Sequence, residues 1–271
     1  MRYTHAILVR IPKTLKLENE KKAKIDLQLA LQQLGSLCDT LRESGVEIIE
    51  LPPEENCPQQ SVLLGDCAIF VNGTALITRP KKPGSRLYEI AVALRSSCWQ
   101  LVETPASERG KEIFLEGSDV LFTGKEIFVG LRKNGTNIEG AMILGRTFAD
   151  FAVIPITLPG TLPLRHYVSF ISKNILVVGS SKEAKQVLQR IERQATFRYK
   201  TLTVEQDAAV NCFNVNEYVI YRQDAPDTKF KILQEPLQLW GINCNELIKL
   251  GNPISRFFVL FREMKSFKSI W

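Results

Sequence analysis

The sequence predicts an α/β fold in which a strand, strand, helix, strand unit is repeated around a closed ring. Three observations support this prediction. A hairpin of two apolar strands recurs along the chain, helix-like segments lie between the hairpins, and the two ends of the chain supply strands for one further unit. Regular alternation of strand and helix patterns is typical of α/β architectures.

Four hairpins are visible in the sequence, each with two apolar strands around a short polar turn. They cover residues 67–77, 119–131, 169–178 and 211–221. The turns fall at Asn72-Gly73, Gly124-Lys125, Lys173-Asn174 and Val215-Asn216. Their spacing of roughly 40 to 50 residues lies in the range of repeated supersecondary units. The hairpins therefore predict four units of one ring.

Helix patterns lie between the strands of these units. The first is an apolar series that ends before Gly45 and is followed by a strand at residues 46–51; its members are Leu27, Leu31, Leu34, Cys38 and Leu41. Ser180 and Glu183 have the spacing of a capping box. One apolar helical face follows this box, made by Ala184, Val187, Leu188 and Ile191.

A fifth unit requires both ends of the chain. We expect the strand at residues 5–11 to lie beside the strand at residues 257–261, because this pairing closes the ring and removes exposed sheet edges. Loops from all five units then meet at the central axis. A functional site is expected at this axis.

Composition narrows the class of protein. The 271 residues are 45% hydrophobic and 24% charged, which is ordinary for a globular protein. No apolar run approaches the ~20 residues of a membrane span, and the first residues are too soon interrupted by Arg10 and Pro12 for a secretory signal. The net charge of +6 is spread along the chain without a nucleic-acid-binding motif, so nucleic-acid binding has no motif to support it.

The six cysteines are scattered, without a CxxC spacing. With only two histidines in the chain, they do not form a zinc motif, and we expect neither a metal nor a cofactor. Reduced thiols at core positions indicate a cytoplasmic protein. The cysteines are Cys38, Cys57, Cys67, Cys98, Cys212 and Cys244.

Residues 115–131, LEGSDVLFTGKEIFVGL, resemble the acidic loop and hairpin of the dimethylarginine dimethylaminohydrolases. Further similar segments are GDCAIFVNGTALITRP, LTVEQDAAVNCFNV and NELIKLGNPISRFFVLF, so the resemblance covers nearly the whole chain. It implies the pentein fold, an α/β-propeller of five ββαβ-type units around a pseudo-fivefold axis. It also implies that residues 1–271 form a single domain.

The catalytic group of that family is a cysteine nucleophile, a histidine that shuttles protons and an acidic residue that orients the histidine. The resemblance places Glu116 at the acidic position, Pro163 at the histidine position and Arg256 at the cysteine position. His166 lies three residues further along an expected strand, so it should miss the axis and be structural. Ser255 lacks the adjacent base that a serine nucleophile needs.

The substrate-binding positions of the family are partly altered here. Where acidic residues hold the guanidinium, this chain has Gln60, Gly65 and Asp66. The arginine that binds the substrate carboxylate is replaced by Glu139, and a second family arginine is matched by Arg86. Asp66, Arg86 and Glu116 are therefore the expected remnants of a ligand pocket. We further predict that Arg256 projects into this pocket and forms an ion pair with its carboxylates.

Two functions follow from this pattern. The first is a catalytically inactive pseudoenzyme that serves as a protein-binding, scaffolding or regulatory module, with an unidentified protein partner and a monomeric or homodimeric state. The alternative is a hydrolase of guanidino compounds with an altered nucleophile, for which Cys67 beside Asp66 is the candidate. The apolar and basic tail at residues 262–271 is a candidate partner surface, with a frayed end as the other interpretation.

Overall fold

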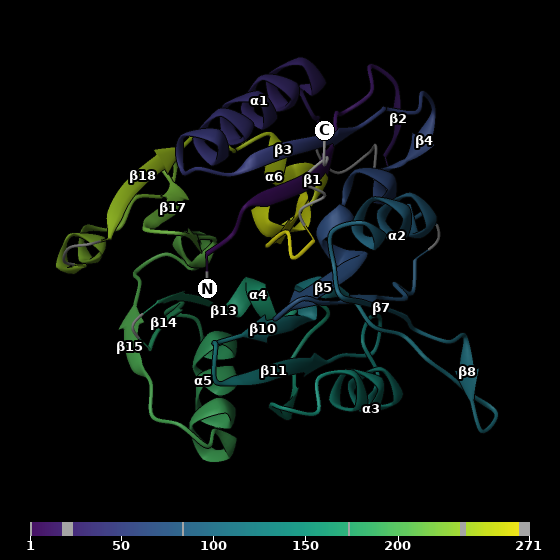
Figure 1. The fold of residues 1–271 in the computed structure, drawn as a ribbon. Coiled ribbons are helices and arrows are strands. Elements are labelled where there is room, and N and C mark those ends of the chain that lie inside the picture. Colours follow the sequence, from purple (N-terminus) through teal and green to yellow (C-terminus); the bar gives the residue numbers. More distant parts are fainter. Residues whose placement is uncertain (1, 18–23, 83, 173, 234–236, 266–271) are drawn as a thin grey trace.

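The computed structural model describes residues 2–17, 24–82, 84–172, 174–233 and 237–265. Within these ranges, five three-stranded sheets are arranged around a central axis (Figure 1). The expected turn residue Lys173 and most of the tail proposed as a partner surface lie outside the described residues. None of the described helices is long and apolar enough to cross a membrane.

The sheets repeat one topology: an antiparallel inner pair of strands, then a third strand parallel to the middle one. The second unit has β5 (Ala68–Val71), β6 (Thr74–Ile77) and β7 (Gln100–Glu103). The third has β10 (Val120–Phe122), β11 (Glu126–Leu131) and β12 (Ala152–Thr157). The fourth has β13 (Val168–Ser172), β14 (Ile175–Val178) and β15 (Lys200–Thr203). The fifth has β16 (Phe213–Val215), β17 (Tyr218–Arg222) and β18 (Gln238–Ile242).

The first unit joins the two ends of the chain, as the sequence predicts. Its middle strand β1 (His5–Val9) pairs antiparallel with β19 (Phe258–Phe261), with His5 opposite Phe261 and Leu8 opposite Phe258. The third strand, β3 (Glu47–Leu51), runs parallel to β1. The ring is therefore closed by hydrogen bonds between the first and the last strand.

The hairpin turns are built from residues that accept a left-handed backbone. Asn72 and Gly73 both have positive φ, 46° and 85°, which is the geometry of the two-residue turns that match strand twist. Asn174 and Asn216 also have positive φ, at 64° and 56°. The fifth turn lies at residues 216–217, one residue later than expected, because asparagine tolerates this conformation and Val215 stays in β16.

Helices connect the middle strand to the outer strand in four of the five units described. They are α1 (Leu27–Glu43), α2 (Leu87–Arg95), α3 (Ile138–Thr147) and α5 (Lys182–Gln194). In the fifth unit the connection contains the short 3₁₀ helix η5 (Thr228–Ile232) instead. The capping prediction is wrong by one residue: Ser181 caps α5 by accepting from Ala184 N at 3.2 Å, while Ser180 donates to Glu205 O at 2.7 Å.

The remaining short elements lie between the units. Two small sheets are made by β2 (Leu15–Lys16) with β4 (Cys57–Pro58), and by β8 (Ser107–Glu108) with β9 (Lys111–Glu112). The short helices are η1 (Gln59–Val62), η2 (Leu64–Asp66), η3 (Gly117–Asp119), α4 (Leu164–Tyr167), η4 (Asp207–Val210), α6 (Leu247–Leu250) and η6 (Ile254–Arg256). Four clusters of buried apolar side chains among the described residues fill the space between sheets and helices.

Candidate functional site

Three short 3₁₀ helices meet at one end of the axis. Each directly precedes an inner strand: η2 leads into β5, η3 into β10 and η6 into β19. Because these three strands begin at the axis, the residues just before each strand lie together at this end of the axis. This is how side chains from positions near 66, 119 and 256 come together.

Two glycines allow these helices to approach closely. A Cβ atom on Gly65 would lie 2.8 Å from Arg256 Cα and 2.9 Å from Phe258 O, with Ser255 O closer still. A Cβ atom on Gly117 would collide with Gly65 O. Distances below 3.0 Å to backbone atoms leave no room for any side chain at these positions. The backbone around residue 256 therefore fills the space into which an acidic side chain at position 65 would have to extend.

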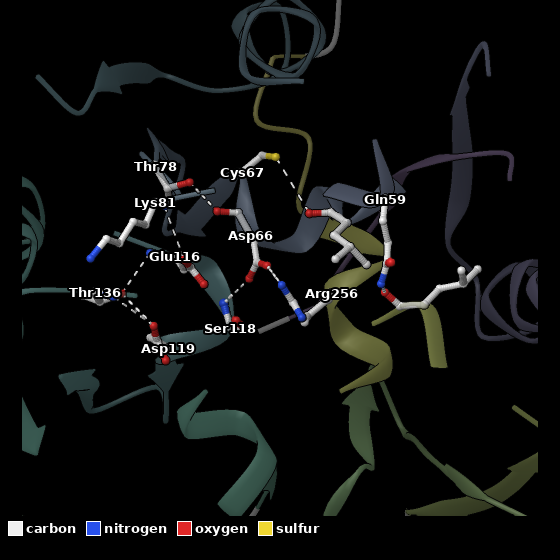
Figure 2. Close-up of polar contacts among 12 residues, drawn as sticks. Gln59, Asp66, Cys67, Thr78, Lys81, Glu116, Ser118, Asp119, Thr136 and Arg256 are labelled. Atoms are coloured by element: carbon white, nitrogen blue, oxygen red, sulfur yellow. Dashed lines mark hydrogen bonds and ion pairs between the residues drawn. The ribbon is translucent and has the colours of Figure 1, made fainter. Parts of the chain in front are cut away.

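Arg256 forms an ion pair with Asp66, as predicted from the sequence (Figure 2). Arg256 Nε lies 2.7 Å and Nη2 2.6 Å from the same carboxylate oxygen of Asp66. The other oxygen accepts a hydrogen bond from Ser118 N at 3.0 Å. Burial alone would raise the pKa of Asp66, but the Arg256 charge and these hydrogen bonds outweigh it and lower that pKa.

Glu116 is held by a residue that the sequence analysis did not single out. Arg132, at the end of β11, donates through Nη2 to Glu116 and through Nε to both oxygens of Asp119, at 2.9 and 3.0 Å. Asp119 also accepts from Thr136 Oγ1 at 2.9 Å and from Leu164 N at 3.2 Å. Arg132 therefore joins Glu116 and Asp119 into a second buried ionic group beside the first.

The negative and positive charges of the five ionic side chains at this end of the axis are unequal in number. Three buried carboxylates, Asp66, Glu116 and Asp119, face two guanidinium groups, Arg132 and Arg256. One carboxylate therefore gains by holding a proton, and Glu116 has the fewest donors. Burial, then repulsion from Asp66, raises the pKa of Glu116 to about 7, against the attraction of both arginines.

The segment expected to carry the missing histidine forms a helix instead of a strand. Pro163 immediately precedes α4 with a φ of −69°, which suits proline at a helix start. The argument that His166 lies on a strand is therefore wrong. His166 Nδ1 contacts Asn252 Nδ2 at 3.1 Å, and burial lowers the pKa of His166. Asn252 lies in the loop that leads to Arg256, so His166 supports that loop from the side.

The other expected pocket residues lie elsewhere. Arg86 is a buried residue that contacts Pro52 O at 2.6 Å, Glu89 at 3.1 Å and Glu54 at 3.5 Å, and no contact joins its side chain to Asp66 or Glu116. Nearer acceptors therefore bind Arg86, and its place among the pocket remnants stays a prediction.

Two further residues that the resemblance matched to substrate-binding positions add no carboxylate to the ionic group at the end of the axis. Glu139 lies in the first turn of α3 and pairs with Lys111 at 3.3 Å. Gln60 is buried in η1. The structure thus assembles Asp66, Glu116 and Asp119, with Arg132 and Arg256, at the end of the axis.

All six cysteines are free and buried. Cys67 points away from Asp66, toward Leu63 O at 3.9 Å (Figure 2). Burial, then the Asp66 charge, raises the pKa of Cys67 to about 12. Such a thiol is almost entirely protonated at neutral pH and is a poor nucleophile. Among the described residues, no group of three or more His, Cys, Asp or Glu side chains is placed to hold a metal ion.

Five ββαβ-type units around an axis, with acidic loops gathered at one end, define this protein as a pentein. In structural comparison it matches the dimethylarginine dimethylaminohydrolase of Pseudomonas aeruginosa in complex with citrulline, with a TM-score of 0.78 and 22% identity over 96% of this chain and all of that one. The substrate-bound N-terminal domain of the cyanobacterial arginine dihydrolase ArgZ gives a TM-score of 0.74 and 15% identity, over 96% of this chain and 98% of that domain. These likenesses confirm the predicted fold.

Sequence comparison identifies the family. The proteins named putative hydrolase DDAH2 from Bos taurus and Homo sapiens are each 34% identical over 275 residues, which cover 94% of this chain and 93% of theirs. The dimethylarginine dimethylaminohydrolase of Pseudomonas aeruginosa is 25% identical over 86% of this chain and 88% of its own. No family model matches the chain. The chain belongs to the dimethylarginine dimethylaminohydrolase family, whose members among these relatives carry hydrolase names.

Proposed function

We propose that this protein is a non-catalytic member of its family, a pseudoenzyme that acts as a protein-binding, scaffolding or regulatory module. The observation that supports this proposal best is the ion pair of Arg256 with Asp66 at the end of the axis. A guanidinium of the protein itself is bound there by the carboxylate that the resemblance assigns to the substrate guanidinium. A free guanidino compound would have to displace it.

The residues matched to the catalytic positions also support the proposal. The family resemblance calls for a thiolate and a proton-transferring imidazole, and Arg256 and Pro163 stand at those positions. An arginine stays protonated and has no nucleophilic lone pair to offer, while a proline side chain transfers no proton. Loss of a nucleophile and base that act together costs about 10⁶-fold in rate where it has been dissected.

A role in protein binding is supported by exposed apolar side chains on two neighbouring units. On α2, Tyr88 and Val92 are one turn apart and are 79% and 53% exposed. On α3, Ile138 and Met142 are likewise one turn apart and are 45% and 53% exposed. Paired apolar side chains on the outside of a helix are the usual anchors of helix-mediated contacts.

A second candidate is a hydrolase of guanidino compounds with an altered nucleophile. The hydrolase names of the relatives favour it, and Cys67 is the thiol nearest Asp66 in sequence. Its thiol would have to be uncovered and ionised before it could attack. The pKa of about 12 for Cys67 and its direction away from Asp66 weigh against this mechanism.

The two candidates are separated by a citrulline assay with asymmetric dimethylarginine. We expect no citrulline above the enzyme-free blank from the wild-type protein, and no difference for Cys67→Ala. Binding of asymmetric dimethylarginine, measured by calorimetry, should also be absent because Arg256 occupies the acidic site. Turnover that is lost in Cys67→Ala would contradict the pseudoenzyme proposal and support the hydrolase.

The binding role is tested separately, by proximity cross-linking in cells of the source. The double variant Tyr88→Lys with Val92→Lys should lose specific partners that the wild-type protein retains. A matched control changes two exposed glutamines of α5, Gln189→Lys with Gln194→Lys, and adds the same charge. Equal partner recovery from both variants would count against α2 as the binding surface.

A further inference from the structure

A cavity of about 370 Å³ lies along the axis, surrounded by the inner strands of the five units. Residues of β5, β10, β13, β16 and β19 all contribute to its wall, and Gly65, Pro253 and Ser255 close it toward the ionic groups described above. The side chains of Asp66, Glu116 and Arg256 do not line it. The cavity is therefore a separate compartment on the other side of η2 and η6.

Arg165 is the charged residue in the wall of this cavity, and no carboxylate lines it among the described residues. Its Nε donates to Val120 O at 2.7 Å. Within the part of the chain that the structure describes, its two Nη groups have no hydrogen-bond acceptor and no ion-pair partner. Burial lowers the pKa of Arg165, yet a guanidinium stays charged in a protein.

This lack of a partner distinguishes the half-buried Arg165 from four other arginines whose side chains lie mostly inside the protein. Arg86 contacts Glu89, Arg132 contacts Asp119, Arg222 contacts Asp224 and Arg256 contacts Asp66. A charge that is partly removed from water is costly unless it is paired, and the Asp66 charge attracts Arg165 without forming an ion pair with it. The four pairs show that this chain follows the rule elsewhere.

Two polar groups without hydrogen-bond partners among the described residues also line the cavity. Tyr3 lines it, and no hydrogen bond is made by the Tyr3 hydroxyl to any described residue. Asn214 lines it as well, and Asn214 Oδ1 is buried without a hydrogen-bond partner among the described residues. Such groups are normally satisfied by a ligand or by ordered water.

We propose that the axial cavity binds a small oxyanion, a carboxylate or phosphate group, through the paired Nη groups of Arg165. A guanidinium presents parallel N–H groups that match two oxygens of either anion. The Tyr3 hydroxyl supplies a further donor, and Asn214 Oδ1 accepts from a hydroxyl or amino group of the same ligand. This site goes beyond the proposed function and does not depend on it, because it uses none of the residues at the family's catalytic positions.

The test measures unfolding and calorimetric titration with sodium phosphate and with sodium acetate, against sodium chloride at equal ionic strength. Wild-type protein should bind at least one of the two oxyanions saturably at one site per chain. At a ligand concentration of 100 times Kd, the unfolding equilibrium constant should fall about 100-fold. Binding of phosphate alone, or of acetate alone, identifies which class of ligand the cavity prefers.

The variant Arg165→Met removes the charge with little change in length, and Arg146→Met is its control. Arg146 is 54% exposed and pairs with Glu108 on the surface, so its loss changes the net charge equally. Arg165→Met should raise the Kd of the oxyanion at least ~10-fold. This is the effect of losing one charge-assisted hydrogen bond of about 1.5 kcal/mol. The Arg146→Met control should bind like the wild-type protein.

Two results would overturn the proposal. One is the absence of saturable binding by wild-type protein beyond the chloride control, and the other is unchanged binding by Arg165→Met. If Arg165→Met does not fold, crystals of the wild-type protein soaked in sodium arsenate, an oxyanion with the shape of phosphate, replace it. An anomalous peak at ion-pair distance from the Nη groups supports the site, and a peak found only on the outer surface refutes it.

Discussion

Replacing Arg256 by methionine would remove the charge that holds Asp66 in its ionised form. Asp66 is 2% exposed, and Arg256 contacts its carboxylate through a hydrogen bond from Nε and an ion pair from Nη2. The variant keeps the carboxylate buried with Ser118 N as its remaining donor and with Glu116 nearby. Breaking one partner of a buried pair costs about 3 to 5 kcal/mol in comparable cases. We expect a loss in this range from the free energy of unfolding at pH 7.

The loss should depend on pH in a defined direction. In the folded wild-type protein the pKa of Asp66 is lowered, so its contribution is present above the unfolded-state pKa of about 3.9 and disappears as pH falls through the folded-state pKa. In Arg256→Met, burial is no longer outweighed, so the carboxyl takes up a proton at a higher pH. The difference between the two proteins should therefore narrow as the pH is lowered from 7 to 4.

Urea-induced unfolding at pH 7 and pH 4 measures this difference. Arg146→Met is the control, because Arg146 and Glu108 form a surface pair that is 54% and 38% exposed. Surface pairs contribute about 0 to 1 kcal/mol. A destabilisation by Arg256→Met no larger than that of Arg146→Met at pH 7 would refute the reasoning, and so would a difference that widens at pH 4.

Two further predictions concern the same end of the axis. The pKa of Glu116 is about 7 in the folded protein, above its unfolded-state value of about 4.3. Protonated Glu116 therefore stabilises the folded state at low pH, and this stabilisation is lost as the pH rises through 7. Relative to Glu116→Gln, wild-type protein should lose about 2 to 3 kcal/mol of unfolding free energy between pH 5 and pH 9, and parallel pH profiles would contradict the assignment. Gly65→Ala should destabilise by about 3 kcal/mol because its Cβ meets backbone atoms, whereas Gly35→Ala, with nothing within 4 Å, should stabilise α1 by up to about 1 kcal/mol. The unfolding temperatures of the two glycine variants measure this difference. Similar changes in stability in Gly65→Ala and Gly35→Ala would contradict the prediction.

The ring could be predicted because its signals are local or concern the chain ends. A hairpin such as 67–77 is specified by its own turn residues, and Asn72-Gly73 adopts the conformation that this pair favours. The pairing of β1 with β19 followed from the need to close the sheet edges. Turn conformation and strand pairing both depend on backbone geometry, and short sequence patterns predict that geometry.

The ionic group could be predicted only in part, because its pairing depends on which strands meet at the axis. The pair of Arg256 and Asp66 was inferred from positions matched by resemblance, and the structure has it. Arg132 lies 13 and 16 residues from its partners Asp119 and Glu116, a spacing without a local pattern. Only the excess of carboxylates around position 116 could have suggested that a second arginine was needed.

Local contacts explain where the structure places two of the side chains considered from the sequence. His166 was placed by strand geometry, but Pro163 starts a helical turn and rotates the following side chains differently. Arg86 was matched to a pocket residue, but Glu89 lies one helical turn away and Pro52 O is 2.6 Å from its guanidinium. In both cases a nearby contact decided the position of the side chain.

The pairing of β1 with β19 has a consequence for synthesis of the protein. The second to fifth units are each contiguous in sequence, so each can form its hairpin and outer strand soon after it leaves the ribosome. The first unit cannot, because β19 follows the other four units along the chain. Until β19 has been synthesised, β1 (His5–Val9) therefore presents an unpaired apolar edge to other nascent chains.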